Sequence, residues 1–484
     1  MADLRLWNHI SFTDEWEKCD TSILDEIVPS WHIRKKALQN KSSDFLAFTD
    51  RLKRRHAIET GIIEKLYDLD KGVTDTLIKE GFVFSLLSHG DTNIPKQTLF
   101  NHLQDHLNAV DFIFDIVKED RPLSKGFICE LHQLTTRHQD FADGRYQFGN
   151  KIILPLLKGA FKDRENNPTR EDGTKVLYCP PEHVVSEMDR LIEIYNALCE
   201  KSVNPLIISA WIHHAFTIIH PFQDGNGRVV RLLSSLILIK NNLFPLTVLR
   251  EDAKLKYIYA LEEADKGNPQ PLVSYFAEIQ KHNIEEALNI RDFKADGLED
   301  AAKILKQKLI SADRREQLEL EKRLDNNRRE LFDFCSRTIN EFKIKLEQSF
   351  DSAVSFSMSI VEPGHVEKSD LKIEKIIDYA SKHNYHFNVN MPKGSIQLVI
   401  EFNHIKYEIF ITIHHYGFEE SVISIAAFLE NMGGYPFDNS TVVQLEIKPH
   451  VVSILDNIHS KERNIKQQLE NILTLSIAQI ANEI

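Results

Sequence analysis

Cysteine is scarce in this sequence. The 484 residues contain five cysteines, an odd and scattered set in which no two form a C-x-x-C pair. Disulfide frameworks and zinc ribbons need cysteines paired at short spacing, so neither kind of site is predicted. Scattered free thiols are typical of a reducing compartment, and we expect a cytoplasmic protein. The cysteines are Cys19, Cys129, Cys179, Cys199 and Cys335.

Long apolar runs and an excess of basic charge are also missing. The longest apolar stretch, Leu232 to Ile239, is broken by Ser234 and Ser235 and is far too short to span a bilayer. The first residues lack the cationic and apolar regions of a signal peptide. Lys and Arg number 59 against 72 Asp and Glu, which gives a net charge of −13 and disfavours nucleic acid as a partner. We therefore expect a soluble protein without a membrane partner.

Length and periodicity predict several domains. A chain of 484 residues with 42% apolar residues is too long for one core. No proline or glycine occurs between Ala301 and Glu362, where charges of both signs alternate with leucines, and β-branched alternating runs follow Pro363. We expect a mainly α chain with four parts: a helical N-terminal region at 1–96, a main helical domain at 97–285 with a hairpin at about 146–181, long charged helices at 286–362, and a small α+β domain at 363–484.

The stretch HPFQDGNGR, from His220 to Arg228, lies between two strongly apolar segments. Asn204 and Pro205 form a good N-cap and first turn, so a helix should run from there to about Ile219. A second helix should begin near Gly227. The polar loop therefore leads into a helix N-terminus, where free backbone N–H groups and the helix dipole favour an anion.

The side chains of this loop suit a nucleotide triphosphate. Arg228 and Arg231 share one face of the second helix and can both reach a polyphosphate. Asp224 offers a hard oxygen ligand for Mg²⁺, and His220 at the lip of the loop can act as a general base. Other phosphate motifs are absent, because no G-x-x-x-x-G-K-[ST] occurs in the sequence.

Two plainer interpretations stay open for the same residues. Turn chemistry alone accounts for Gly, Asn and Asp in a connection between helices, with His220 as an ordinary residue at a helix end. A zinc site at His213, His214 and His220 is disfavoured, because adjacent histidines point to different helix faces and no cysteine or carboxylate completes a tetrahedron.

The full stretch HPFQDGNGRVVR, His220 to Arg231, resembles the signature H-P-F-x-[DE]-G-N-G-R-x-x-R of the Fic (Fido) family. The resemblance extends over roughly Gln97 to Gln280, where the hairpin before YCPP, Tyr178 to Pro181, looks like the family's flap. It implies a helical core that transfers AMP from ATP to a Tyr, Thr or Ser hydroxyl of a protein and releases pyrophosphate. The C-terminal half of the chain is not covered.

The resemblance also implies roles for individual residues. Ile258 stands where the family has a second tyrosine, and Tyr257 suits a helical core equally well by its spacing. The implied roles are the base for His220, the Mg²⁺ ligand for Asp224, the loop anchor for Phe222, the phosphate cradle for Gly225, Asn226 and Gly227, phosphate contacts for Arg228 and Arg231, and the nucleoside pocket for Tyr257 and Asp265.

Many members of the family carry an inhibitory helix of the form [ST]-x-x-x-E-[GN], whose glutamate pairs with the second signature arginine, here Arg231. The stretch TLIKEG, with Glu80, fits the pattern fully. The stretch TGIIEK, with Glu64, has Lys65 in the glycine position but lies in a more typical setting, so we favour Glu64. Each glutamate is equally well read as a solvated helix carboxylate.

The leading hypothesis is thus a protein adenylyltransferase that uses ATP and Mg²⁺, binds its target through the hairpin edge and also modifies itself. A related enzyme with another phosphate-containing donor stays open, although Gly225 and Gly227 favour ATP. A nucleotide-gated interaction protein with little catalysis is the third alternative. Homo-oligomers stay open, and neither the target nor the role of residues 300–484 is predicted.

Overall fold

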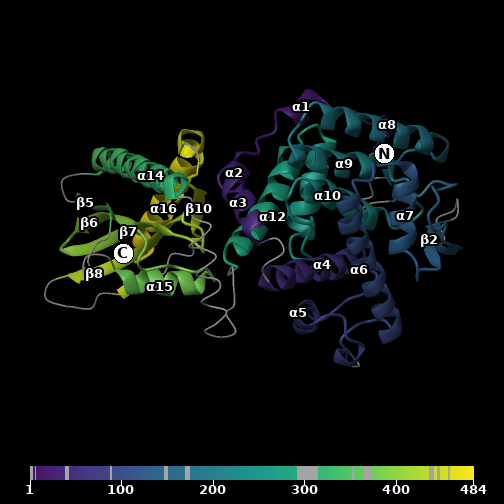
Figure 1. The fold of residues 1–484 in the computed structure, drawn as a ribbon, viewed down its shortest axis with the longest axis horizontal. Coiled ribbons are helices and arrows are strands. Elements are labelled where there is room, and N and C mark those ends of the chain that lie inside the picture. The colour runs from purple at the N-terminus through teal and green to yellow at the C-terminus, as the bar shows by residue number, and fades with distance from the viewer. Residues whose placement is uncertain are drawn as a thin grey trace. The chain divides into compact units, whose positions relative to one another are not determined.

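The computed structural model divides the chain into two units (Figure 1). The first unit is Met1–Thr21 with Leu46–Asn283, and the second is Ser22–Phe45 with Ile284–Ile484. The residues that the structure describes are 4–5, 7–38, 43–87, 90–145, 151–168, 175–290, 314–350, 354–364, 372–434, 441–443, 447–455 and 458–483.

Two fully buried helices form the centre of the first unit. In α9 (Pro205–Ile219) and α10 (Asn226–Lys240) nearly every side chain is buried, as expected for helices that are apolar on all sides. They pack against each other, and α10 also contacts α6 (Lys96–Glu119) and α7 (Lys125–Thr135), while α8 (Pro181–Glu200) lies against α9 (Figure 1). The loop between α9 and α10 is therefore held from both ends by the core.

The ends of these two helices follow from their sequence. The Asn204 side chain accepts a hydrogen bond from the Leu206 N–H, and Pro205 occupies the first turn of α9. His220 ends α9 in the left-handed region, with φ 51°, and Gly225 precedes α10 with φ 78°. The predicted helix over Pro205–Ile219 is confirmed, and the second helix begins one residue before the predicted Gly227.

Shorter elements surround the central helices. The expected hairpin at about 146–181 differs from the observed one, which is formed by β2 (Phe141–Arg145) and β3 (Lys151–Pro155). The segment near residue 175 is not part of it, because β4 (Lys175–Val176) pairs in parallel with β1 (Leu4–Arg5). Residues 146–150 and 169–174 of the predicted hairpin lie outside the described residues. The helices α4 (Ser43–Ile63) and α12 (Gln270–Leu288) each have a few residues that belong to the second unit. The other elements of the first unit are α1 (Asp14–Glu17), α5 (Lys71–Glu80), η1 (Phe84–Leu86), the π-helix η2 (Ala253–Ile258) and α11 (Tyr259–Asp265).

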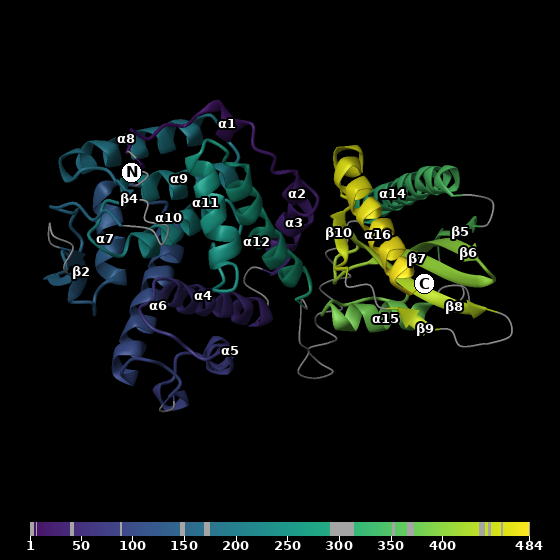
Figure 2. The same ribbon diagram turned by 180° about the vertical axis from the view of Figure 1, so that it is seen from behind.

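The second unit is built on an antiparallel sheet of strand order β10-β8-β7-β6-β5, with β9 paired to β8. The helices α14 and α16 cover one face of the sheet and α15 lies on the other (Figure 2). The elements are α2 (Ser22–Asp25), α3 (Val28–Leu38), α14 (Arg314–Ser349), β5 (Val354–Gly364), α15 (Ile373–Lys382), β6 (Lys393–Phe402), β7 (Ile405–His415), β8 (Val422–Gly434), β9 (Thr441–Val443), β10 (His450–Ser453), η3 (Ile458–Lys461) and α16 (Glu462–Glu483).

The structure corrects one part of the expected fold. Helices were expected up to residue 362, but β5 occupies 354–364, because Val354, Phe356 and Met358 alternate with serines and place one apolar face on the sheet core. The long charged helix α14 agrees with the prediction, whereas 291–313 lie outside the described part of the chain. The expected fold class, mainly helical with a small hairpin and a C-terminal α+β region, is confirmed.

Candidate active site

Phe222 fixes the loop between α9 and α10 to the core. Its side chain is fully buried, and its ring stacks on His132 of α7 with 3.9 Å between ring centroids. The Asn226 amide grips the backbone of the same residue, because its Oδ1 accepts from the Phe222 N–H at 2.9 Å and its Nδ2 donates to the Phe222 carbonyl at 2.8 Å. Asn226 is thus a structural clamp of the loop, and the phosphate contact expected from the family resemblance stays a prediction.

The Asp224 carboxylate lies at the turn of the loop and is partly open to solvent. Its Oδ1 accepts from the Gly225 N–H at 2.6 Å, and its Oδ2 accepts from Gln139 Nε2 at the same distance. The guanidinium of Arg228 lies 3.7 Å from Oδ1. The carboxylate is therefore held in a fixed orientation by three neighbours, which suits a group that has to receive a cation.

The imidazole of His220 lies flat against the Tyr178 ring, with 3.9 Å between ring centroids. Burial, and then the nearby Lys162 ammonium, lower the pKa of His220 to about 3. Its Nδ1 is buried and has no hydrogen-bond partner among the described residues. A histidine in this setting is neutral at neutral pH, which is the form that can accept a proton.

Arg228 is the least satisfied charged group of the site. Its side chain is 0% exposed, and NH1 donates to the Thr135 carbonyl at 3.2 Å. Its Nε and NH2 have no hydrogen-bond partner within the described ranges, and burial lowers the pKa of the guanidinium. Buried donors without acceptors are rare because they forfeit their hydration, so these two nitrogens are suited to an incoming anion.

Arg231 is paired with a carboxylate of the chain itself. Its NH2 lies 2.5 Å from Glu64 Oε1, and its Nε donates to Thr60 Oγ1 at 3.3 Å. Burial opposes the charge of Arg231, but Glu64 and the Tyr257 hydroxyl outweigh it and raise the pKa of the guanidinium. A Cβ added to Gly227 would collide with the Glu64 carboxylate. Glu64 thus lies directly against the first turn of α10.

Glu80, the alternative inhibitory residue, has a different setting. Its side chain is 55% exposed at the end of α5 and pairs with the neighbouring Lys79 at 3.4 Å. The structure therefore brings Glu64 to the second signature arginine. Lys65, which follows Glu64, adopts φ 57°, the left-handed conformation for which glycine is best suited.

The two residues expected in a nucleoside pocket are anchored by histidines of α9. The Tyr257 hydroxyl lies 2.7 Å from His213 Nε2 in the core, and Asp265 Oδ1 lies 2.9 Å from His214 Nε2. Ile258, which stands where the family has a second tyrosine, is 45% exposed. His213 and His214 thus have structural partners, and the described residues contain no cluster of three or more metal-ligating side chains.

Sequence reasoning missed four residues that shape this site. His132 and Gln139 reach the loop from the end of α7, while Tyr178 and Lys162 flank His220. All four lie at least 40 residues before their partners, so no local motif or periodicity could have identified them. Only the three-dimensional fold brings them to the loop.

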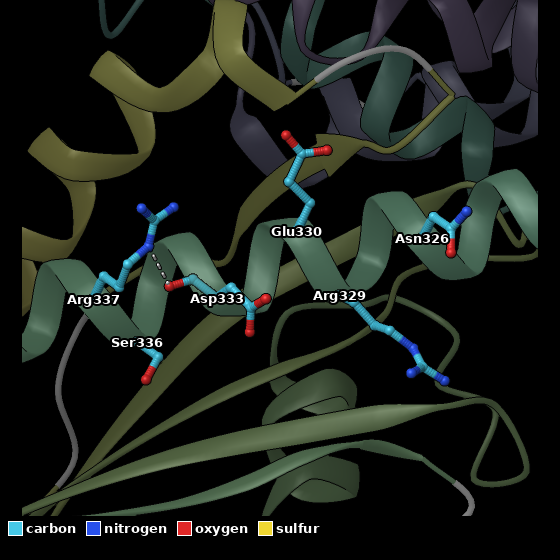
Figure 3. A pocket seen from close by; sticks show the side chains of 6 residues that line it. All are labelled: Asn326, Arg329, Glu330, Asp333, Ser336 and Arg337. Carbon is cyan, nitrogen blue, oxygen red and sulfur yellow. Dashed lines mark hydrogen bonds between the residues drawn. The ribbon is translucent and has the colours of Figure 1, made fainter.

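A shallow hollow lies elsewhere, on the exposed face of α14 (Figure 3). It is lined by Asn326, Arg329, Glu330, Asp333, Ser336 and Arg337. The Arg337 Nε donates to the backbone carbonyl of Asp333 at 3.4 Å, and Glu330 lies 3.4 Å from His459 Nε2. These are ordinary partners of surface charges, so the loop between α9 and α10 is the stronger candidate site. No helix within the described ranges is long and apolar enough to cross a membrane.

Comparison with known proteins finds similarity in the region that contains the loop between α9 and α10. Residues 122–238 match the model of the Fic/DOC family. Protein adenylyltransferase fic-1 of Caenorhabditis elegans is 28% identical over 118 residues, which is 24% of this chain and 23% of that protein. A probable protein adenylyltransferase of Aquifex aeolicus is 40% identical over 88 residues, 18% of this chain and 26% of that protein.

A solved Fic-domain signalling protein of Bacteroides thetaiotaomicron is 22% identical with a TM-score of 0.45, over 55% of this chain and 99% of that one. The chain spans about a quarter of the length of the two curated relatives. The family match includes α7, the hairpin, α9, the loop and most of α10. Residues 122–238 are therefore a Fic/DOC family segment with distant homology to protein adenylyltransferases.

Proposed function

We propose that this chain transfers AMP from ATP to a Tyr, Thr or Ser hydroxyl of a protein and that Glu64 holds it in an inhibited state. One observation carries the proposal. The N-terminus of α10 offers an anion site in which two nitrogens of Arg228 have no acceptor among the described residues and Arg231 is occupied by the chain's own carboxylate.

The residues of the loop fit a nucleotide triphosphate. The Nε and NH2 of Arg228, which have no acceptor among the described residues, supply two buried donors. Gly227 has no side chain, so the space beside the helix N-terminus that the Glu64 carboxylate now occupies could take a phosphate oxygen once Glu64 leaves. Asp224 is the carboxylate that would hold Mg²⁺, which neutralises phosphate charge when bound. Gly225 and Asn226 are proposed to form the phosphate cradle together with Gly227, and the Gly225 main chain and the Asn226 side chain shape this turn through their bonds to Asp224 and Phe222.

His220 is the proposed general base. Its imidazole is neutral, so it can take the proton of the attacking hydroxyl while the oxygen of that hydroxyl forms a bond to the α-phosphorus. The bond from the α-phosphorus to the bridging oxygen breaks, and pyrophosphate leaves. Tyr178, stacked on the imidazole, keeps the ring in one plane during this step.

The β2–β3 hairpin is the proposed docking edge for the target, including a copy of this chain. Its Phe141 and Ile153 side chains are exposed, Ile153 by 68%, although they are large and apolar. An extended peptide can add to such an edge through backbone hydrogen bonds, which demands little of its sequence. Tyr257 and Asp265 are proposed to line the nucleoside pocket. Their hydrogen bonds to His213 and His214 fix both side chains in position.

Intact-mass spectrometry with ATP and Mg²⁺ tests the function. We expect little gain in mass for the parent protein, a gain of one or more AMP units for Glu64→Gly, and none for Glu64→Gly with His220→Ala. Glu80→Gly is the matched control and should behave like the parent. A gain of another mass would identify a different phosphate-containing donor. Nucleotide binding without any gain in the Glu64→Gly protein would favour the nucleotide-gated interaction protein.

A further inference from the structure

Two side chains hold Asp224 from two sides: His132 in the last turn of α7 and Gln139 in the connection between α7 and β2. His132 Nε2 lies 3.0 Å from the backbone carbonyl of Asp224, and Gln139 Nε2 lies 2.6 Å from its carboxylate Oδ2. The first contact fixes the main chain of the loop and the second fixes the direction of the carboxylate. The proposed metal ligand is therefore positioned by a segment that precedes it by more than 80 residues.

The same two side chains also hold the two ends of the hairpin. His132 Nδ1 accepts from the Gly159 N–H at 2.9 Å, just after β3, and Gln139 Nε2 donates to the carbonyl of Phe141, the first residue of β2, at 3.1 Å. Each residue is thus a bridge between the hairpin and Asp224. The two bridges attach to different ends of the hairpin. Gln139 binds at the first residue of β2, and His132 binds after the last residue of β3.

Hydrogen-bond chemistry fixes the direction of both bridges. Gly159 offers an N–H, so His132 Nδ1 has to accept, and Nε2 carries the proton that it donates to Asp224. Gln139 faces two acceptors, the Asp224 carboxylate and the Phe141 carbonyl, and its NH2 group has one hydrogen for each.

We propose that His132 and Gln139 are positioning residues that couple the β2–β3 hairpin to Asp224, so that Mg²⁺-ATP at the loop and a peptide on the hairpin strengthen each other's binding. This inference rests on the proposed nucleotide function. Movement of the hairpin ends changes the distances at His132 and Gln139, and both residues pass that change to Asp224. By linkage the effect is reciprocal, and couplings of this kind are typically about 5- to 150-fold.

Two substitutions in the Glu64→Gly protein remove the bridges while keeping the packing. Gln139→Leu keeps the approximate shape without the amide, and His132→Phe keeps the stacking on Phe222 without either hydrogen bond. By calorimetry, we expect each to weaken ATP binding about tenfold at saturating Mg²⁺ and to change it little without Mg²⁺. Gln104→Leu, which removes an exposed glutamine on α6 that bonds to Asn108, is the matched control and should change neither value.

Hydrogen exchange measures the coupling directly. Mg²⁺-ATP should slow the exchange of hairpin amides in the Glu64→Gly protein, and this protection should be lost in the Gln139→Leu and His132→Phe variants. In the Asp224→Asn background, Gln139→Leu should have no further effect on nucleotide affinity, because its partner is already altered.

Equal Mg²⁺ dependence in Gln139→Leu and in its parent would overturn the coupling, as would undiminished protection of the hairpin in that variant. If His132→Phe does not fold, the Gln139→Leu measurements decide the question alone. A Glu64→Gly protein that binds no nucleotide at all would instead refute the proposed function, and the coupling with it.

Discussion

Arg228 and Arg231 lie three residues apart on one helix, yet their surroundings affect the stability of the folded chain in opposite directions. Arg228 is buried with two nitrogens unsatisfied among the described residues, whereas Arg231 has the carboxylate of Glu64 beside it. A buried charge without partners reduces stability, while removing one member of a buried pair strands the other. Arg228 thus has nitrogens that an added anion could satisfy, and Arg231 is already paired with a carboxylate.

This contrast predicts opposite effects of the same substitution. Arg228→Met should raise the free energy of unfolding by about 1 kcal/mol or more, since it replaces a guanidinium that has two unsatisfied nitrogens among the described residues by an apolar chain. Arg231→Met, the matched control, should lower it by about 1–3 kcal/mol, because Glu64 is only 20% exposed and loses its partner. Urea unfolding measures both, and a destabilised Arg228→Met protein would contradict the view of Arg228 as an unsatisfied group.

Asp224 permits a second prediction at the scale of the residue. Asp224→Ala should make ATP binding weak and insensitive to Mg²⁺, because the triphosphate charge then lacks its cation at the loop. Calorimetry in the Glu64→Gly protein with and without Mg²⁺ measures this. An Asp224→Ala protein that responds to Mg²⁺ as its parent does would assign the metal to other ligands.

Among the elements, α4 matters for the site because Glu64 directly follows its last residue, Ile63. Glu59 in this helix forms a bidentate pair with Arg250, at 2.8 Å for the shortest contact, and Tyr67 folds back so that its hydroxyl donates to the Ile58 carbonyl. The Tyr67 ring lies directly on Gly61, where no side chain fits. These contacts fix the end of α4 to Arg250 and to the turn that carries Tyr67.

Gly61→Ala should therefore release Glu64 without altering it. The new methyl group collides with the Tyr67 ring and displaces the turn, so we expect increased automodification, below that of Glu64→Gly, and a loss of about 1–3 kcal/mol of stability. Gly72→Ala in α5, where the nearest atom is Asp70 Oδ1 at 3.2 Å, is the matched control. Mass spectrometry compares the three, and unchanged modification in a folded Gly61→Ala protein would argue against a rigid turn.

The elements also show what the sequence could and could not predict. The caps at Asn204 and Gly225 and the apolar flanks were sufficient to predict α9, the loop and α10, because these signals are local. The strand β5 was missed, since its short alternation directly follows a charged helix and was read as a continuation of it. The contacts of His132 and Gln139 depend on how distant helices pack, which no local pattern encodes.

At the scale of the molecule, each unit has its own buried histidines. Burial lowers the pKa of His56 in the first unit to about 3 and that of His414 in the second unit to about 3. These groups are neutral in the folded chain and titrate near pH 6.5 when unfolded. Between pH 6.5 and about 3 the unfolded chain binds more protons, so acid favours unfolding.

The free energy of unfolding should accordingly fall as the pH drops below about 6.5. Each such histidine contributes a loss of about 1.4 kcal/mol per pH unit. Urea unfolding at pH 7.0, 6.0 and 5.0 measures the slope, and His414→Gln should reduce it for the second unit, where Tyr385 can still hydrogen-bond to the amide. A slope that is unchanged by this substitution would mean that His414 is protonated in the folded chain.

On the proposed function, the contact between Glu64 and Arg231 makes Glu64 a competitor of ATP for the same guanidinium. A tethered carboxylate is present at a fixed effective concentration, on the order of millimolar or higher, which does not change with the amount of protein. ATP has to bind the fraction of molecules in which the contact is open, and each 1.4 kcal/mol in favour of the closed contact weakens the apparent affinity about tenfold. The strength of this single ion pair would then set the nucleotide concentration at which the protein becomes active.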